Sequence, residues 1–267
     1  MVTLFAFLFL GASFFSLWFK REPKIWGSLL FLSLLCGIIA GNILWIGLLF
    51  IIALLLLWLL YNRQPSLGLF LAIICLSSAF KLHFLPGYQP FGFTPKFAVG
   101  LENPLIGLFP LALLVSLARN VEDWKGVLKG LAMGCVGILI IACFAAFSGV
   151  VHLQFKLLPF IGVRTLSNLV LTSIPEEGFY RGFVQKTLCD YFNNKTTGKI
   201  AAVLLTSSLF TAHHIFWSPN VGILVFTFLA SLLYGIIYLL SKRIESAMLS
   251  HFLLNLIHMT LFAYHSA

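Results

Sequence analysis

Apolar runs long enough to cross a membrane follow one another along almost the whole chain, from Val2–Phe19 to Ala247–Phe262. A spanning helix needs about 20 mainly apolar residues, because the hydrocarbon layer is about 30 Å thick. Charged residues make up only 9% of the chain, whereas soluble domains carry about 25%. A chain this apolar cannot cover its own surface in water, so we expect lipid to be its solvent.

These runs predict an all-α fold, a polytopic transmembrane bundle of roughly 8–10 helices. Helices are one of only two structures that satisfy every backbone polar group inside a bilayer. The predicted spans are Val2–Phe19, Ile25–Ala40, Ile43–Tyr61, Leu67–Leu85, Pro104–Leu117, Val127–Phe147, Leu157–Thr172, Ile200–Phe216, Val221–Leu240 and Ala247–Phe262.

The net charge of +9 does not indicate a nucleic-acid partner, because the cations form no patch. They sit in small groups between apolar runs, which is how membrane proteins mark their cytoplasmic loops. The first run carries its cations behind it, at Lys20 and Arg21, which predicts a retained helix rather than a cleaved signal peptide. We expect an integral protein of a bacterial inner (plasma) membrane, with membrane lipid as a partner. The oligomeric state is left open.

Two adjacent acids, Glu176 and Glu177, lie in an otherwise apolar region. Charges at membrane depth are costly, so they are candidates for function. Arg181 follows Glu177 by four residues, which places the two on one helix face as an ion pair. Glu176 is rotated by about 100° from Glu177 and can face another partner. One acid held by arginine and one left for other contacts suggests a brace and a general base.

The stretch before these acids carries helix-start signals. Thr172 and Ser173 precede Pro175, and the two acids follow it. We therefore expect one apolar segment to end near Thr172 and a new helix to run from about Pro175 to Phe192. The two glutamates would then sit at a helix N-terminus, where the dipole favours their ionised form.

Histidines in two later apolar runs complete the candidate site. His213 and His214 lie near the end of one run, while His251 and Asn255 lie four apart in another and share a helix face. Imidazoles, an amide and a carboxylate on separate helices can converge inside a bundle and activate a water. The loop and tail histidines, His83, His152 and His265, are expected to be solvated.

Three motifs in this region resemble those of a known family of intramembrane proteases. They are the two glutamates with Arg181, the Phe-three-His spacing, and the His-three-Asn spacing, which read Glu176-Glu177-Gly178-Phe179-Tyr180-Arg181, Phe210-Thr211-Ala212-His213-His214 and His251-Phe252-Leu253-Leu254-Asn255. The family is that of the type II CAAX prenyl endopeptidases and bacteriocin-processing proteins, the CPBP or Abi family. The likeness covers Leu166–Phe262, so residues 151–267 would be a catalytic domain and 1–150 transmembrane helices of unknown role.

The resemblance implies an endopeptidase that hydrolyses a peptide bond of a membrane-associated peptide or protein. Glu176 would be the general base that activates water with His214, and His251 and Asn255 would stabilise the oxyanion. Glu177 and Arg181 would brace the helix. An alternative within the family is a metalloprotease, in which His214, His251 and Glu176 bind zinc. The Phe210 spacing favours His214 over its neighbour His213, which stays an alternative.

Two other classes of protein compete with this interpretation. A non-catalytic membrane scaffold or chaperone of the same fold would be expected to lack one or more site residues, and none is missing here. A proton-coupled transporter would favour inverted repeats and broken helices in both halves, whereas the polar residues described above cluster in the C-terminal half.

Overall fold

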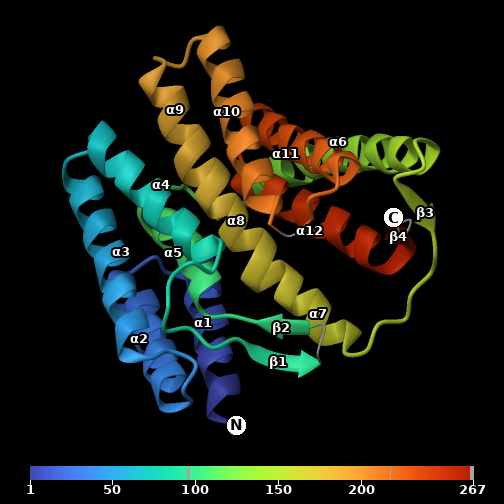
Figure 1. Ribbon diagram of the computed structural model, residues 1–267. Coiled ribbons are helices and arrows are strands. Elements are labelled where there is room, and N and C mark those ends of the chain that lie inside the picture. The colour runs from blue at the N-terminus through green and yellow to red at the C-terminus, as the bar shows by residue number, and fades with distance from the viewer. Residues whose placement is uncertain (95–96, 217, 265–267) are drawn as a thin grey trace. The chain divides into compact units, whose positions relative to one another are not determined.

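The computed structural model describes residues 1–94, 97–216 and 218–264. Within these residues the chain forms ten helices and four short strands, when the consecutive segments α7 to α9 are counted as one helix. The predicted all-α polytopic bundle is therefore confirmed (Figure 1). The chain divides into two compact units, Met1–Leu117 and Ala118–Ala267. These units are defined by packing, whereas the predicted division at residue 150 concerns function and stays a prediction.

Unit 1 begins with four apolar helices, followed by a hairpin and a short helix. The helices are α1 (Val2–Phe19), α2 (Pro23–Ile39), α3 (Trp45–Arg63), α4 (Leu67–Lys81) and α5 (Glu102–Leu113), and the strands are β1 (Phe91–Thr94) and β2 (Phe97–Val99). Small polar side chains join α1 to α2: Ser13 Oγ donates to Trp26 O at 2.8 Å, and Ser33 Oγ donates to Ala6 O at 2.7 Å. Such bonds let apolar helices approach closely without leaving a polar group unsatisfied in hydrocarbon.

The predicted span Pro104–Leu117 is wrong, because α5 has only 12 residues. At 1.5 Å per residue it is about 18 Å long, too short to cross a bilayer. It is nevertheless buried almost throughout, and Arg21 donates from Nε to Ala112 O and from Nη1 to Val115 O, both at 2.6 Å, where the helix ends. The guanidinium thereby satisfies backbone carbonyls that the end of a helix leaves open.

Glu102, at the start of α5, is a buried acid that sequence reasoning passed over. Its Oε1 lies 3.0 Å from His83 Nδ1, so His83 is solvent-exposed as predicted but also pairs with a buried carboxylate. Tyr88 lies nearby and donates its hydroxyl to Gly47 O at 2.5 Å. Burial and the charge of Glu102 raise the pKa of Tyr88, which keeps the phenol protonated as a donor. His265, also predicted to be solvated, lies outside the described residues.

Unit 2 is built on a long helix, α6 (Val121–Phe147), which packs against α11 (Val221–Ser241) and α12 (Ile244–Leu261). A further helix, α10 (Thr196–His214), packs on α11, and strands β3 (Val151–Leu153) and β4 (Phe262–Tyr264) pair antiparallel. Glycines let α6 approach α12: a Cβ atom on Gly130 or Gly134 would collide with the side chain of Ser246 or Ser250. This close approach fixes the helix that carries His251.

The helix break predicted near Thr172 is wrong. One continuous helix runs from Ile161 to Tyr191, through α7 (Ile161–Ser167), η1 (Asn168–Ser173), α8 (Ile174–Phe179), η2 (Tyr180–Gln185) and α9 (Lys186–Tyr191) (Figure 1). The wider π-helical turn η1, in which Ile174 N–H donates to Leu169 O, lies directly before Pro175. Local π-helical adjustment accommodates a proline that would otherwise clash with the preceding turn.

This continuity changes the setting of the two glutamates. Glu176 and Glu177 lie in the middle of a long helix, between two π-helical segments, and not at a helix N-terminus. The helix dipole therefore cannot favour their charge, and side chains must do so instead. The predicted span Leu157–Thr172 also changes, because the helix begins only at Ile161.

Four of the described helices, α1, α3, α6 and α11, are both long and apolar enough to cross a membrane. All ten predicted segments correspond to helices of the described residues, and these four meet the criteria of both length and hydropathy. Helices α2 and α4 are apolar but shorter, with 17 and 15 residues. The integral membrane class itself stands, because exposed apolar side chains cover much of both units.

Candidate active site

The first motif forms a fully buried ion pair. Arg181 Nη1 donates to Glu177 Oε1 at 3.2 Å, and Arg181 Nε lies 3.1 Å from Glu177 Oε2. The second contact is close enough for charge attraction but is not aligned as a hydrogen bond. Both side chains have no exposed surface. The i,i+4 pairing expected from the sequence is therefore present, and neither charge is left alone in the interior.

Glu177 also binds the third motif. His251 Nδ1 lies 2.8 Å from Glu177 Oε1. A carboxylate can only accept, so this nitrogen carries the proton and Nε2 is directed elsewhere. The ring is also held by Tyr234 on α11, which stacks on it at 4.9 Å between centroids with an interplanar angle of 15°. Two independent contacts therefore fix the orientation of His251.

Helix α11 holds the cluster formed by Glu177, Arg181 and His251. The residues of α11 that do so were not predicted from the sequence. Arg181 Nη2 donates to both the carbonyl and the hydroxyl of Ser231 at 2.7 Å, and Gln185 Nε2 donates to Gly235 O at 3.0 Å. Arg181 also faces aromatic rings, with its Cζ 5.4 Å from the centroid of Tyr234. In the sequence, Arg181 and Gln185 are four residues apart, as are Ser231 and Gly235, but this spacing does not indicate which residues pair with which. These contacts give both terminal nitrogens of the guanidinium hydrogen-bond partners and so offset most of the cost of burying it.

His214 lies beside the cluster and is half-buried. Its Nδ1 lies 2.7 Å from Phe210 O, one turn earlier on α10, so Nδ1 donates and Nε2 is the remaining acceptor. Its ring stacks on Phe210 with centroids 4.4 Å apart, and the same phenyl ring meets His251 edge-on at 5.8 Å. Phe210 thus packs against both predicted histidines, which brings the second and third motifs together.

His213 has a different environment from His214. It is buried, and its Nδ1 lies 2.6 Å from the hydroxyl of Tyr180 in η2. Adjacent residues on a helix point about 100° apart, so the two imidazoles serve different neighbours. The two histidines therefore have different contacts. His214 is half-buried and shares the Phe210 ring with His251, whereas His213 is bound to Tyr180.

Glu176 is buried, with 4% of its surface exposed. It lies within electrostatic range of both Tyr180 and Tyr234. Tyr180 is four residues further along the same helix, so both side chains lie on one face. The predicted base therefore shares a helix face with a phenol, whereas Glu177 pairs with a guanidinium.

Asn255 lies one turn beyond His251 on α12. Its Nδ2 donates to Asn168 Oδ1 at 3.0 Å, and Asn168 Nδ2 donates to Phe252 O at 3.1 Å. A carboxamide nitrogen has two hydrogens, so one N–H of Asn255 is engaged in this bond and the other is available to a substrate. Asn168 lies in η1 and was not predicted.

The donor set for zinc is incomplete in this arrangement. Across residues 1–94, 97–216 and 218–264, no group of three His, Cys, Asp or Glu side chains is placed to hold a metal ion. The alternative set of Glu176, His214 and His251 therefore does not form a preorganised metal site here, and we derive no step through a metal.

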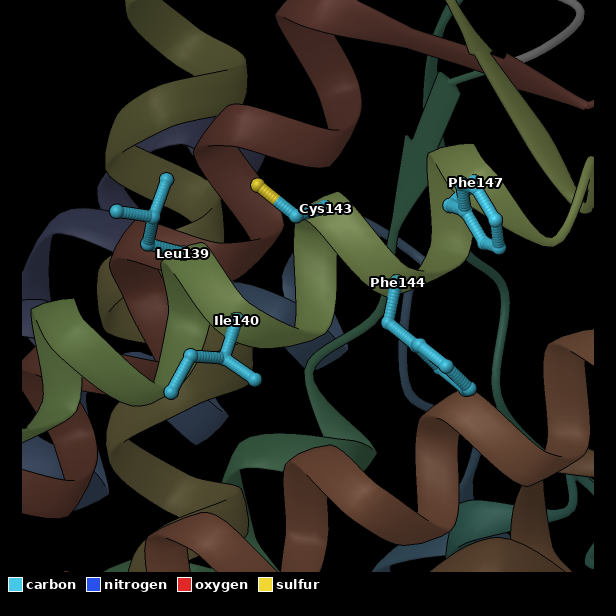
Figure 2. A pocket seen from close by; sticks show the side chains of 5 residues that line it. All are labelled: Leu139, Ile140, Cys143, Phe144 and Phe147. Atoms are coloured by element: carbon cyan, nitrogen blue, oxygen red, sulfur yellow. The ribbon is translucent and has the colours of Figure 1, made fainter.

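A shallow apolar hollow elsewhere in unit 2 is not a second candidate. Its lining side chains, Leu139, Ile140, Cys143, Phe144 and Phe147, all project from α6 (Figure 2). All five are exposed, and Phe147 is 91% accessible. A hollow lined by one helix without polar groups has nothing to orient a substrate. It is a surface suited to lipid.

Comparison with known families decides the identity of the segment that holds the cluster. Residues 159–257 match the family model described as type II CAAX prenyl endopeptidase Rce1-like. This segment resembles that family. It includes all three motifs and ends shortly after Asn255. No curated protein and no solved structure gives a significant match to the chain.

The match confirms the resemblance to type II CAAX prenyl endopeptidases. It covers the helix from Ile161 to Tyr191, all of α10 and α11, and most of α12, while α1–α6 lie outside it. The family's description names an endopeptidase, and the apolar helices make the chain an integral membrane protein.

Proposed function

We propose that this chain is an endopeptidase that cleaves membrane-associated peptides within the bilayer. The observation that carries the proposal is the buried chain of contacts from Arg181 through Glu177 to His251. It ties the first motif to the third within an Rce1-like segment. Burying two or three charged groups in an apolar bundle is costly, and such groups mark functional sites more often than structural ones.

In the proposed reaction Glu176 is the general base and His214 its partner in activating a water. The water oxygen attacks the carbonyl carbon, and its proton passes to the Glu176 carboxylate. The proton then moves to the amide nitrogen as the C–N bond breaks. The products are a free amine and a carboxylic acid whose new oxygen came from water. The half-buried imidazole of His214, with Nε2 as an acceptor, suits a water contact.

His251 and Asn255 are proposed to stabilise the tetrahedral oxyanion. A doubly protonated His251 donates Nδ1–H to Glu177 and has Nε2–H left for the oxyanion. Asn255 uses the amide hydrogen that is not bound to Asn168. Glu177 and Arg181 act as the brace that orients His251, a role in which preorganisation matters more than direct contact with the substrate.

The experiment is cleavage by the purified full chain in lipid vesicles, read by mass spectrometry. The probes are a farnesylated peptide ending in a CAAX sequence, its unprenylated counterpart, and an apolar transmembrane peptide. We expect Glu176→Gln and His214→Ala to slow cleavage by about 10²–10⁴-fold, the usual contribution of a positioned acid or base. The exposed acid Glu122, changed to Gln, is the matched control and should leave the rate unchanged.

The same panel separates the alternatives. A scaffold or a proton-coupled transporter predicts no cleavage of any probe by the wild-type chain, together with normal folding. Metal analysis of the same sample tests the metalloprotease alternative, because stoichiometric zinc that is lost in His214→Ala would contradict the base assigned to Glu176. Cleavage of only the transmembrane peptide would move the substrate class away from prenylated peptides.

A further inference from the structure

Tyr180 and His213 form a second buried polar pair that the proposed reaction does not use. The hydroxyl of Tyr180 lies 2.6 Å from His213 Nδ1. Tyr180 is fully buried, and this is its only hydrogen bond among the residues that the structure describes. A buried phenol needs an acceptor for its proton. The arrangement is satisfied when Nδ1 is bare and Tyr180 donates to it.

The pair lies next to the proposed base. Glu176 and Tyr180 are four residues apart on one helix face, and the backbone N–H of Tyr180 donates to Glu176 O in the same turn. Tyr180 also packs against Phe210, with ring centroids 4.8 Å apart, and has the Arg181 guanidinium 5.9 Å from its ring centre. The hydroxyl therefore has the imidazole of His213 as its acceptor, and the buried carboxylate of Glu176 lies on the same helix face one turn earlier.

A phenol has one proton, so it can serve only one of these acceptors at a time. A hydrogen bond donated to a carboxylate stabilises its charged form and makes it a weaker base. In the observed arrangement the hydroxyl lies against His213 Nδ1, which accepts that proton when the nitrogen is unprotonated. Without His213, the nearest carboxylate one helical turn away would compete for it.

We propose that His213 is a positioning residue that holds the Tyr180 proton away from Glu176 and so keeps Glu176 an effective base. The inference rests on the proposed function and assigns the two adjacent histidines to different tasks. His214 stays with the reacting water, and His213 acts through Tyr180.

The test is a set of four variants measured for kcat and KM with whichever vesicle-bound peptide the wild type cleaves. His213→Leu removes the acceptor, and we expect it to lower kcat about 10-fold with little change in KM, because the weakened base acts after binding. Tyr180→Phe removes the proton itself and should be close to wild type. The double variant should recover to the level of Tyr180→Phe. His213→Asn, whose amide oxygen lies near the position of Nδ1, should retain most of the activity.

Recovery in the double variant is the result that a merely structural histidine would not give. A double variant as slow as His213→Leu, or a 10-fold loss in Tyr180→Phe alone, would overturn the inference. Thermal unfolding of each variant reports whether it folds, and a 10-fold loss in a folded Tyr180→Phe would overturn the inference even where His213→Leu fails to fold. Wild type that cleaves nothing, or Glu176→Gln that cleaves normally, would overturn the proposed function as well, so the two failures are distinguishable.

Discussion

The two units both bury acidic side chains, but they satisfy them in different ways. In unit 1, Glu102 is 3% exposed and pairs with His83, a loop residue whose side chain is 63% exposed. In unit 2, Glu177 is completely buried and pairs with Arg181 and His251, which are both buried and both on helices. The first arrangement has a partner that water can reach, and in the second every member has 4% or less of its side chain exposed.

This difference indicates where a precise site can be built. A side chain on an exposed loop can exchange its partner for solvent at modest cost, so the pair in unit 1 tolerates motion. A buried cluster on packed helices cannot, because each member that moves leaves another charge without compensation. Sites on helices are correspondingly more precise than sites on loops. The contrast predicts unequal responses to equivalent changes in the two units.

The largest effect is expected on removal of the guanidinium in unit 2. Arg181→Met leaves Glu177 buried without its cation and Ser231 without its donor, which should destabilise the chain by about 3–5 kcal/mol and abolish cleavage. Arg181→Lys keeps the charge and should be milder in stability while still disturbing His251. Denaturant unfolding in mild detergent measures both. A loss below about 1 kcal/mol for Arg181→Met would contradict the brace.

A smaller effect is expected when a side chain is added to a glycine at the contact between α6 and α12. Gly134→Val places a branched side chain against Ser250 and should cost about 1–3 kcal/mol through overpacking. Gly27 of α2 in unit 1 has nothing within reach of a Cβ atom, so Gly27→Ala should be neutral or stabilise by up to about 1 kcal/mol. Thermal unfolding of the two variants compares the units directly. Equal destabilisation would show that the close approach of α6 and α12 is not a constraint.

The His83–Glu102 pair of unit 1 should contribute less to the free energy of unfolding than the His251–Glu177 pair of unit 2. His83→Ala removes one partner of Glu102, and we expect a loss of about 1 kcal/mol, because water can replace an exposed imidazole. His251→Ala, its counterpart in unit 2, should cost more stability and also remove cleavage. Unfolding and peptide cleavage measured on both variants test the comparison. A loss of cleavage in His83→Ala beyond its loss of folded protein would place unit 1 in the chemistry.

The smallest effects are expected at helix starts. Asn120 Oδ1 accepts from Asp123 N–H at 2.9 Å at the start of α6, and Ser66 Oγ accepts from Leu69 N–H at 3.3 Å at the start of α4. Replacing either by Ala should cost about 0.5–1 kcal/mol, with Asn120→Ala the larger because its bond is shorter. Both variants should cleave normally. Thermal shifts large enough to match Arg181→Met would contradict this order.

Much of the site followed from spacing along the chain. The i,i+4 relation predicted the Glu177–Arg181 pair, and the motifs at Phe210 and His251 predicted which apolar segments carry polar groups. Local chemistry fixes such features, because neighbours on one helix meet whatever the rest of the fold does. Apolar run lengths likewise predicted the helical class and the number of helices.

The rest depended on tertiary contacts that spacing does not carry. The helix-start signals at Pro175 were overridden by a π-helical turn, so the acids lie in mid-helix. Ser231 and Tyr234 support Arg181 and His251 from a helix with no charged residue to draw attention to it. Asn168, which binds Asn255, lies nearly ninety residues away in sequence. These contacts join residues of different helices, so they can be identified only once the packing of the helices is known.

Glu176, adjacent to Glu177 of the buried cluster, is proposed to activate the attacking water, and an isotope measurement tests this role. Cleavage is run in water labelled with heavy oxygen, and the new carboxyl terminus of the product is analysed by mass spectrometry. We expect one labelled oxygen at that terminus with the wild-type chain, and no product above background with a folded Glu176→Gln variant. Labelled product formed by Glu176→Gln at the wild-type rate would contradict it.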